Sequence, residues 1–278
     1  MNSGSNILRF PNAPRPASLP MYSLPELEGT ITKWWHGVAH HMREAGVANI
    51  PDVLTIPDDR IQHWLDPDLL FSQTCGYPLT HILADKVTVI ATPIYDAPGC
   101  EGADYSSMVI IPENLNVNNL SDLAGLDVAI NGWDSHSGFN IFRAMVAEVA
   151  EPGERFFLRT LVTDSHARSI AAVRNKEAQC AAVDAVTLAM IGKHQPESLD
   201  GIRVLCQSPM APGLPYITSR KVSDEELQKL QTGLFAALAD SDLVPLAEDL
   251  LIKGATLAGP EDYQRIIDIE TAGASVIF

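Results

Sequence analysis

The 278-residue sequence predicts an α/β fold built from mostly parallel sheets with helices on both faces. Short apolar runs of strand length alternate with helical patterns along most of the chain. Apolar residues make up 46% of the chain and charged residues 19%, so the sequence can bury a core. Its length suits one large domain or two small lobes. No apolar run approaches the ~18 residues of a membrane span.

The expected strands and helices follow one another in order. Strands are expected over residues 17–22, 69–72, 87–93, 108–111, 128–130, 157–162, 179–183, 202–207 and 216–218. Helices are expected over residues 27–44, 139–149 and 165–174. Ser223 with Glu226 three residues later predicts the start of another helix. Pro260 near a first turn predicts the last one.

The net charge of −16 limits the class of partner. Proteins that bind nucleic acids or anionic membranes need a basic face, so this acidic charge argues against both partners. A small anion is a different case, because backbone N–H groups at a helix N-terminus can hold it inside an acidic protein.

Residues 1–16 lack the apolar stretch of about 7–15 residues that an export signal needs, and we expect them to form a flexible tail. The four cysteines have no metal-ligand spacing, so no metal or other cofactor is expected. Free thiols and disulfides both stay open for them.

In open sheets of this class, ligands bind beyond the carboxyl ends of the strands, so the turns that follow strands are the expected site. The turn over residues 131–140 places Ser135, His136, Ser137 and Asn140 at the start of a helix. Capping alone would explain the two serines. Hydroxyls, an imidazole and free N–H groups at one helix N-terminus also suit a phosphate-like or carboxylate group.

Four further turns or strand ends offer polar groups. Tyr22 ends the first expected strand and could wall a pocket or lie in the core. Gln73 and Thr74 offer hydrogen-bond donors in a turn after the second strand, and His166 follows a later one. Asp184 ends a strand of small residues, where it could cap a helix or accept from a ligand amine or hydroxyl.

The sequence supports a catalytic role for these turns less well than a binding role. Asp-Ser-His occurs at residues 134–136 and 164–166, but members of a triad act across space rather than as neighbours in sequence. A pairing of Ser135 with His166 stays open. Cys75 would need an adjacent base and a lowered pKa to act as a nucleophile.

Six segments together resemble the phosphonate-binding branch of the periplasmic solute-binding proteins of ABC transporters. They are SLPMY (18–22), LLFSQTCGYPL (69–79), NLSDLAGLDVAIN (119–131), DSHSGFN (134–140), SHARSIAAVRNKEAQCAAVDAVT (165–187) and SPMAPGLPYIT (208–218). Each is weak alone, but they occur in the family's order over residues 17–272.

The resemblance implies a type II periplasmic-binding-protein fold, with two Rossmann-like lobes joined by a two-strand hinge around a central ligand cleft. Lobe one would hold residues 17–94 and 208–278, and lobe two residues 95–207. The chain would leave lobe one near Pro93 and return near Ser208.

The resemblance also implies roles in the site. The helix that begins near Ser135–Ser137 would hold the anion, while the 71–78 turn and Tyr22 would face it from lobe one. Asp184 would meet the ligand's other end, such as an amine. Two features depart from the family: the export signal is missing, and His136 with residues 138–140 replaces a run of small hydroxyl residues.

The expected function is binding of a small anionic, phosphonate-like solute as the substrate-binding component of an ABC uptake system, with a membrane permease as partner and no catalysis. The compartment stays open between periplasm, which the family implies, and cytoplasm, which the first residues suggest. The alternative is a non-transport member of the fold, either a ligand sensor or an enzyme acting on a small phosphorylated or anionic metabolite. An enzyme would need an acid–base pair with shifted pKa values in the cleft.

Overall fold

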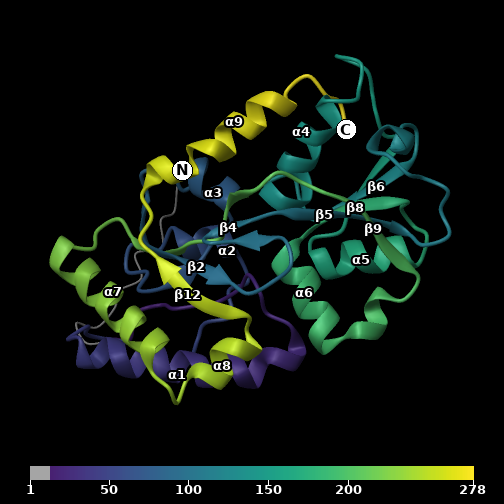
Figure 1. Ribbon diagram of the computed structural model, residues 1–278. Coiled ribbons are helices and arrows are strands. Elements are labelled where there is room, and N and C mark those ends of the chain that lie inside the picture. The colour runs from purple at the N-terminus through teal and green to yellow at the C-terminus, as the bar shows by residue number, and fades with distance from the viewer. Residues whose placement is uncertain (1–12) are drawn as a thin grey trace.

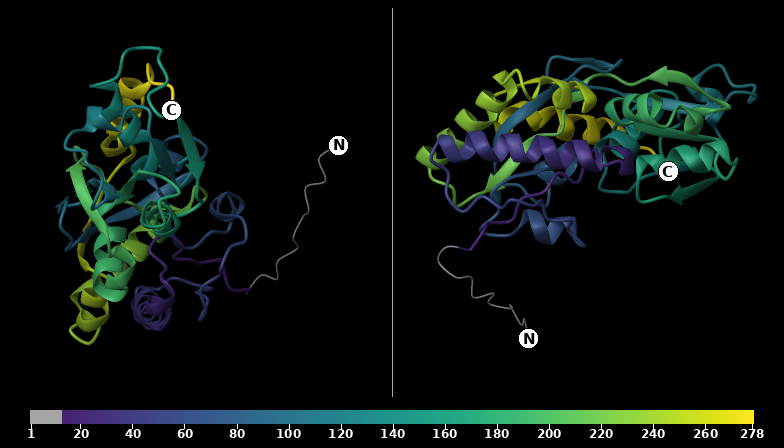
Figure 2. Two further views of the ribbon diagram at one scale, coloured as in Figure 1. Left: turned by 90° about the vertical axis from the view of Figure 1, so that its right-hand side faces the viewer. Right: turned by 90° about the horizontal axis from the view of Figure 1, so that it is seen from below.

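The computed structural model describes residues 13–278, which form two main sheets covered by helices and one small sheet between them (Figures 1 and 2). The first sheet has the order β1-β11-β2-β12, with β1 (Ser72–Gln73), β2 (Val87–Tyr95), β11 (Tyr216–Ser219) and β12 (Ile252–Thr256). The second has the order β7-β6-β8-β5-β9, with β5 (Ser107–Pro112), β6 (Asp127–Ile130), β7 (Arg159–Val162), β8 (Cys180–Asp184) and β9 (Ile202–Gln207). The third, β10-β4-β3, contains β3 (Cys100–Glu101), β4 (Asp104–Tyr105) and β10 (Ala211–Pro212).

The α-helices are α1 (Glu28–Glu44), α2 (Arg60–Trp64), α3 (Gly76–Thr80), α4 (Ile141–Ala147), α5 (His166–Arg174), α6 (Ala185–His194), α7 (Asp224–Ala239), α8 (Val244–Asp249) and α9 (Gln264–Gly273). A π-helical turn, η3 (His136–Asn140), leads directly into α4, and a 3₁₀ turn, η5 (Pro260–Tyr263), into α9. The predicted helix starts at Ser165 and Ser223 are confirmed, because each serine caps its helix.

Strand alternation explains how the second sheet is buried on both faces. Side chains point alternately to opposite faces of a strand. In β6, Val128 and Ile130 pack with Phe142 of α4, whereas Ala129 packs with Ile170 of α5 on the other face. Continuous apolar strands of this kind are expected where helices cover both faces of a sheet.

The prediction of mostly parallel sheets is wrong for the first sheet. All of its strand pairs are antiparallel, and in the second sheet only the pairs of β6 with β7 and with β8 are parallel. The reason is topological: β2 carries the chain out of the first sheet and β11 brings it back in the opposite direction. Strand–helix alternation along the sequence does not reveal such a return.

The predicted strand over residues 17–22 is also wrong. Only Ala17 makes a bridge, with Phe71, and the chain then runs as an extended loop. Pro16 and Pro20 lack the N–H that a strand ladder uses, which explains the early end. The expected tail over residues 1–16 lies mostly outside the described residues, and its end is held: the Arg15 guanidinium bonds the carbonyl of Leu69 and the Glu226 carboxylate.

Two segments cross between the main sheets, residues 96–106 on the way out and residues 208–215 on the way back. The small sheet lies between them, since β10 of the returning segment pairs with β4 of the outgoing one. This arrangement supports the predicted lobes of residues 17–94 with 208–278 and of residues 95–207, and that division stays a prediction.

The end of the chain departs from the predicted division. Helix α9 packs against both α3 and α4, and in Figure 1 it crosses the top of the molecule to end beside α4. Phe278 lies in the core of the second sheet, 4.8 Å from the ring of Phe157. The last residues therefore contribute to the lobe opposite the one expected, because their apolar side chains fill its open face. Within residues 13–278, no helix is long and apolar enough to span a membrane.

Candidate functional site

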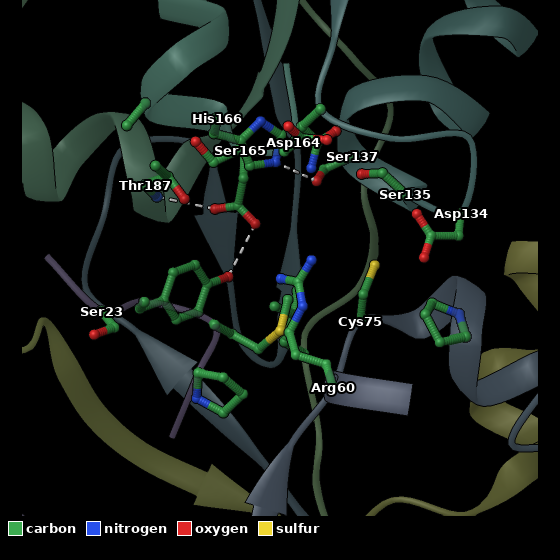
Figure 3. A pocket seen from close by; sticks show the side chains of 18 of the residues that line it. Ser23, Arg60, Cys75, Asp134, Ser135, Ser137, Asp164, Ser165, His166 and Thr187 are labelled. Carbon is green, nitrogen blue, oxygen red and sulfur yellow. Dashed lines mark hydrogen bonds between the residues drawn. The ribbon is translucent and has the colours of Figure 1, made fainter. Parts of the chain in front are cut away.

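A cavity of about 490 Å³ lies between the two main sheets and is lined from both sides (Figure 3). Five of the predicted site residues are on its wall: Tyr22, Ser135, Ser137, His166 and Asp184. They come from four separate chain segments that the fold brings together, three of which are turns at the carboxyl ends of β6, β7 and β8. This edge of a sheet is where ligands of α/β proteins bind.

The turn over residues 135–140 forms the best donor group of the cavity. Ser135 caps the π-helical turn by accepting a hydrogen bond from the Gly138 N–H at 3.1 Å. The Ser137 N–H has no hydrogen-bond partner among the described residues. Ser135 and Ser137 are 6% and 3% exposed, so a bound anion would meet these groups with little competing water. A helix N-terminus with unused N–H groups favours negative charge.

The His166 ring lies beside the Ser137 hydroxyl. Its Nε2 lies 2.9 Å from Ser137 Oγ. Burial lowers the pKa of His166 to about 4, so the ring is neutral near pH 7. If Nε2 carries the ring proton and donates to Ser137 Oγ, the serine hydroxyl is free to donate to an anion.

The same contact does not make a catalytic triad. His166 Nδ1 has no partner among the described residues, so no carboxylate orients the ring. Asp164, the nearest candidate in sequence, pairs with Arg168 at 3.2 Å. Cys75 accepts a hydrogen bond from the His136 N–H at 3.4 Å, and burial raises the pKa of its thiol, which is the opposite of an activated nucleophile.

Asp184 and Tyr22 form a contact across the cavity. Asp184 caps α6 by accepting from the Thr187 N–H at 3.0 Å, and the Tyr22 hydroxyl donates to its other oxygen at 2.9 Å. The carboxyl is 1% exposed, and this desolvation raises its pKa to about 6. Asp184 is thus a helix cap and also part of the cavity wall, and its contact with a ligand stays a prediction.

Four predicted site residues are not on the cavity wall. Gln73 donates to the Tyr95 hydroxyl and to the Leu214 carbonyl, each at 3.0 Å. The other three, Thr74, His136 and Asn140, are fully buried. Asn140 donates to the carbonyl of Ile266 in α9 at 3.2 Å, so it anchors the π-helical turn from behind.

The imidazole of His136 is the least expected of these groups. Burial lowers its pKa to about 3, so it is neutral. Its Nδ1 lies 3.1 Å from the Asn140 amide, and its Nε2 has no partner among residues 13–278. A histidine in the turn therefore adds no positive charge for an anion.

Sequence reasoning missed several residues that line the cavity, among them Arg60, Asn131, Asp134 and Thr187. Asn131 and Asp134 belong to the turn already singled out, and Thr187 is one helical turn beyond Asp184, so their positions could have been inferred. Arg60 gave no such signal, because it begins a short helix in a loop region far from any strand end.

Comparison with known proteins identifies relatives of this arrangement. The model of a family described as "ABC transporter, phosphonate, periplasmic substrate-binding protein" matches residues 66–263. The "Phosphonates-binding periplasmic protein" of Escherichia coli strain K12 is 28% identical over an alignment of 173 residues that covers 54% of this chain. The alignment spans about half of that relative, 51% of its length.

Two solved structures share the fold over nearly the whole chain. A binding protein component of an ABC phosphonate transporter from Pseudomonas aeruginosa matches with a TM-score of 0.74 at 19% identity, covering 94% of this chain and 87% of its own. PhnD1 from Prochlorococcus marinus, in complex with methylphosphonate, matches with a TM-score of 0.76 at 13% identity, covering 94% and 98%. These likenesses confirm the predicted mixed α/β periplasmic-binding-protein fold.

Proposed function

The chain belongs to the phosphonate-binding family of ABC-transporter periplasmic substrate-binding proteins, which are not catalysts, and on that basis we propose that it binds a phosphonate or a related small oxyanion in the cavity between its lobes. Delivery of this ligand to a membrane permease is part of the proposal, since the permease follows from the family. The observation that carries the proposal is the buried turn with Ser135 and Ser137 on the cavity wall.

The turn supplies donors that suit such an anion. The hydroxyls of Ser135 and Ser137, one unused N–H group and the end of a helix dipole converge there without a buried counter-ion. Each charge-assisted hydrogen bond contributes about 1.5–3 kcal/mol. Two or three such bonds contribute about 3–9 kcal/mol in all, which is less than the ~8 kcal/mol of micromolar binding plus the ~4 kcal/mol or more that association costs, so the rest of the cavity wall must contribute as well.

The part of the cavity wall that contains Asp184 suggests which chemical group the other end of the ligand carries. Asp184 is a buried acceptor that becomes easier to ionise when a cationic or donating group lies beside it. A ligand with an oxyanion at one end and an amine or hydroxyl at the other would satisfy both walls. At about 490 Å³, the cavity has room for a molecule larger than a bare inorganic anion.

A thermal-shift screen of small anions tests the proposal. We expect methylphosphonate, 2-aminoethylphosphonate or inorganic phosphate to raise the unfolding temperature in a concentration-dependent way. A ligand present at 100 times its dissociation constant should stabilise the protein by about 2.7 kcal/mol. Acetate and chloride at the same ionic strength serve as controls for general salt effects. Equal, small shifts for every anion would contradict a phosphonate-type site.

A further inference from the structure

Arg60 projects into the cavity from the lobe opposite the anion turn. It is the first residue of α2 and lines the cavity, with its guanidinium directed toward the space in front of Ser137 and Cys75 (Figure 3). Its side chain is exposed, and among the described residues it forms no hydrogen bond or ion pair. Its charge is therefore available to a ligand.

The position of Arg60 is fixed by the packing of its helix. Trp64, at the other end of α2, is 3% exposed and donates to the Ser72 hydroxyl at 3.1 Å. Asp59 caps the helix by accepting from the Gln62 N–H at 3.1 Å. The Trp64 contact holds the helix against the first sheet, and the Asp59 cap fixes where the helix begins, so the first residue of α2 lies at the cavity.

Local structure gives no reason for an arginine at this place. A cation at the first position of a helix is disfavoured by the positive end of the helix dipole. The neighbouring carboxylates of Asp58 and Asp59 are exposed like Arg60 itself, so water screens their attraction, and neither forms an ion pair with Arg60 among the described residues. An unpaired positive charge that is accessible on the cavity wall fits a role in binding.

The charge of the cavity wall strengthens the argument. Its acidic residues are Asp58, Asp59, Asp134, Asp164 and Asp184. Arg60 is the single lysine or arginine on the wall among the described residues, and the His166 ring is neutral near pH 7. An oxyanion at the serine turn would lie among aspartates with one cation to offset them.

We propose that Arg60 binds the ligand's oxyanion across the cavity while the Ser135–Ser137 turn binds it from the other lobe. The inference rests on the proposed function and deepens it. A tetrahedral phosphonate has three oxygens, so it can meet the serine donors and the fork of the guanidinium together. A carboxylate has two oxygens in one plane and cannot serve both walls as well, so Arg60 favours phosphonate over carboxylate.

Isothermal titration of methylphosphonate into the unmodified chain and three variants tests the inference. Arg60→Gln should weaken binding about 10- to 100-fold, the loss expected for a charge-assisted pair. Arg60→Lys keeps the positive charge but lacks the forked guanidinium, so its affinity should lie between that of the unmodified chain and that of Arg60→Gln. Arg220→Gln is the matched control: it removes the same charge from an exposed residue that does not line the cavity, and affinity should be unchanged.

The outcomes separate this inference from the proposed function. Normal affinity in Arg60→Gln with a binding-competent unmodified chain would overturn the role of Arg60 alone. Equal losses in the Lys and Gln variants would contradict a role for its charge. Failure of the unmodified chain to bind methylphosphonate, inorganic phosphate or 2-aminoethylphosphonate would overturn the proposed function, and the inference with it.

Discussion

Asp184 is a buried carboxyl whose two oxygens each accept one hydrogen bond, from the Thr187 N–H and the Tyr22 hydroxyl. These bonds favour the ionised form, yet desolvation outweighs them and raises its pKa to about 6. A carboxyl so placed costs the folded protein stability when it ionises. The same property makes it sensitive to any ligand group that can donate to it.

This residue makes the stability of the protein depend on pH. The pKa of Asp184 is about 6 in the folded chain, against 3.8 for the ordinary carboxyl. Below pH ~4 this carboxyl is protonated in both the folded and the unfolded chain. As the pH rises from ~4 to ~6, it ionises in the unfolded chain before it ionises in the folded one, and the free energy of unfolding falls by about 3 kcal/mol in all. Asp184→Asn should therefore gain stability relative to the unmodified chain between pH 4 and 7. Urea unfolding of both at each pH measures the difference, and a difference that does not change with pH would contradict the shift.

Asp184 should also discriminate between ligands. A positively charged amine beside it would lower its pKa again and regain the energy lost to desolvation. We expect Asp184→Asn to lose at least tenfold in affinity for 2-aminoethylphosphonate and much less for methylphosphonate. Calorimetric titration with both ligands gives the comparison. Equal losses for the two would remove Asp184 from a discriminating role.

Among the elements, the packing of α1 on α7 depends on one glycine. A Cβ built on Gly233 of α7 would lie 2.6 Å from the Met42 Cα in α1. Both helices would have to separate to admit it, because the obstacle is backbone rather than a flexible side chain. The close approach of these helices is therefore specified by a residue that periodicity in the sequence does not single out.

Gly233→Ala should destabilise the protein by about 1–3 kcal/mol through this overlap. Gly29 of α1 is the matched control, since a Cβ there meets nothing within 4 Å. Gly29→Ala should be neutral or stabilising by about 0.5–1 kcal/mol, as alanine favours a helix. Chemical denaturation of the two variants checks both values. A stable Gly233→Ala variant would show that the helices are packed less closely than described.

The helices and strands also show which structural features local sequence patterns can predict and which they cannot. Strands with strong apolar runs, such as β2 and β8, and helices with serine caps, such as α5, were predictable because their signals are local. The segment over residues 17–22 looked similar, but prolines end its pairing after one bridge. Whether strands pair in parallel depends on how the chain returns, which no local pattern records.

On the scale of the whole molecule, the site forms where turns that follow strands of the second sheet face segments that pack on the first sheet. The turns of the second sheet were predictable, since strand-to-helix turns at one sheet edge must lie together. Arg60 and the crossing of α9 were not, because each depends on where a distant segment packs. His136 and Asn140 were expected in contact with ligand for their chemistry, and they lie behind the turn because the π-helical backbone directs them inward.

Binding of methylphosphonate by the serine turn is the central claim, and calorimetric titration of the Ser135→Ala/Ser137→Ala double variant tests it most directly. Loss of two hydroxyl donors to an anion should weaken binding by ~10²-fold or more, while stability falls by only ~1 kcal/mol from the lost Ser135 cap. Ser223→Ala removes a cap from α7 away from the cavity and should leave affinity unchanged. A folded double variant that binds methylphosphonate as tightly as the unmodified chain would contradict the account.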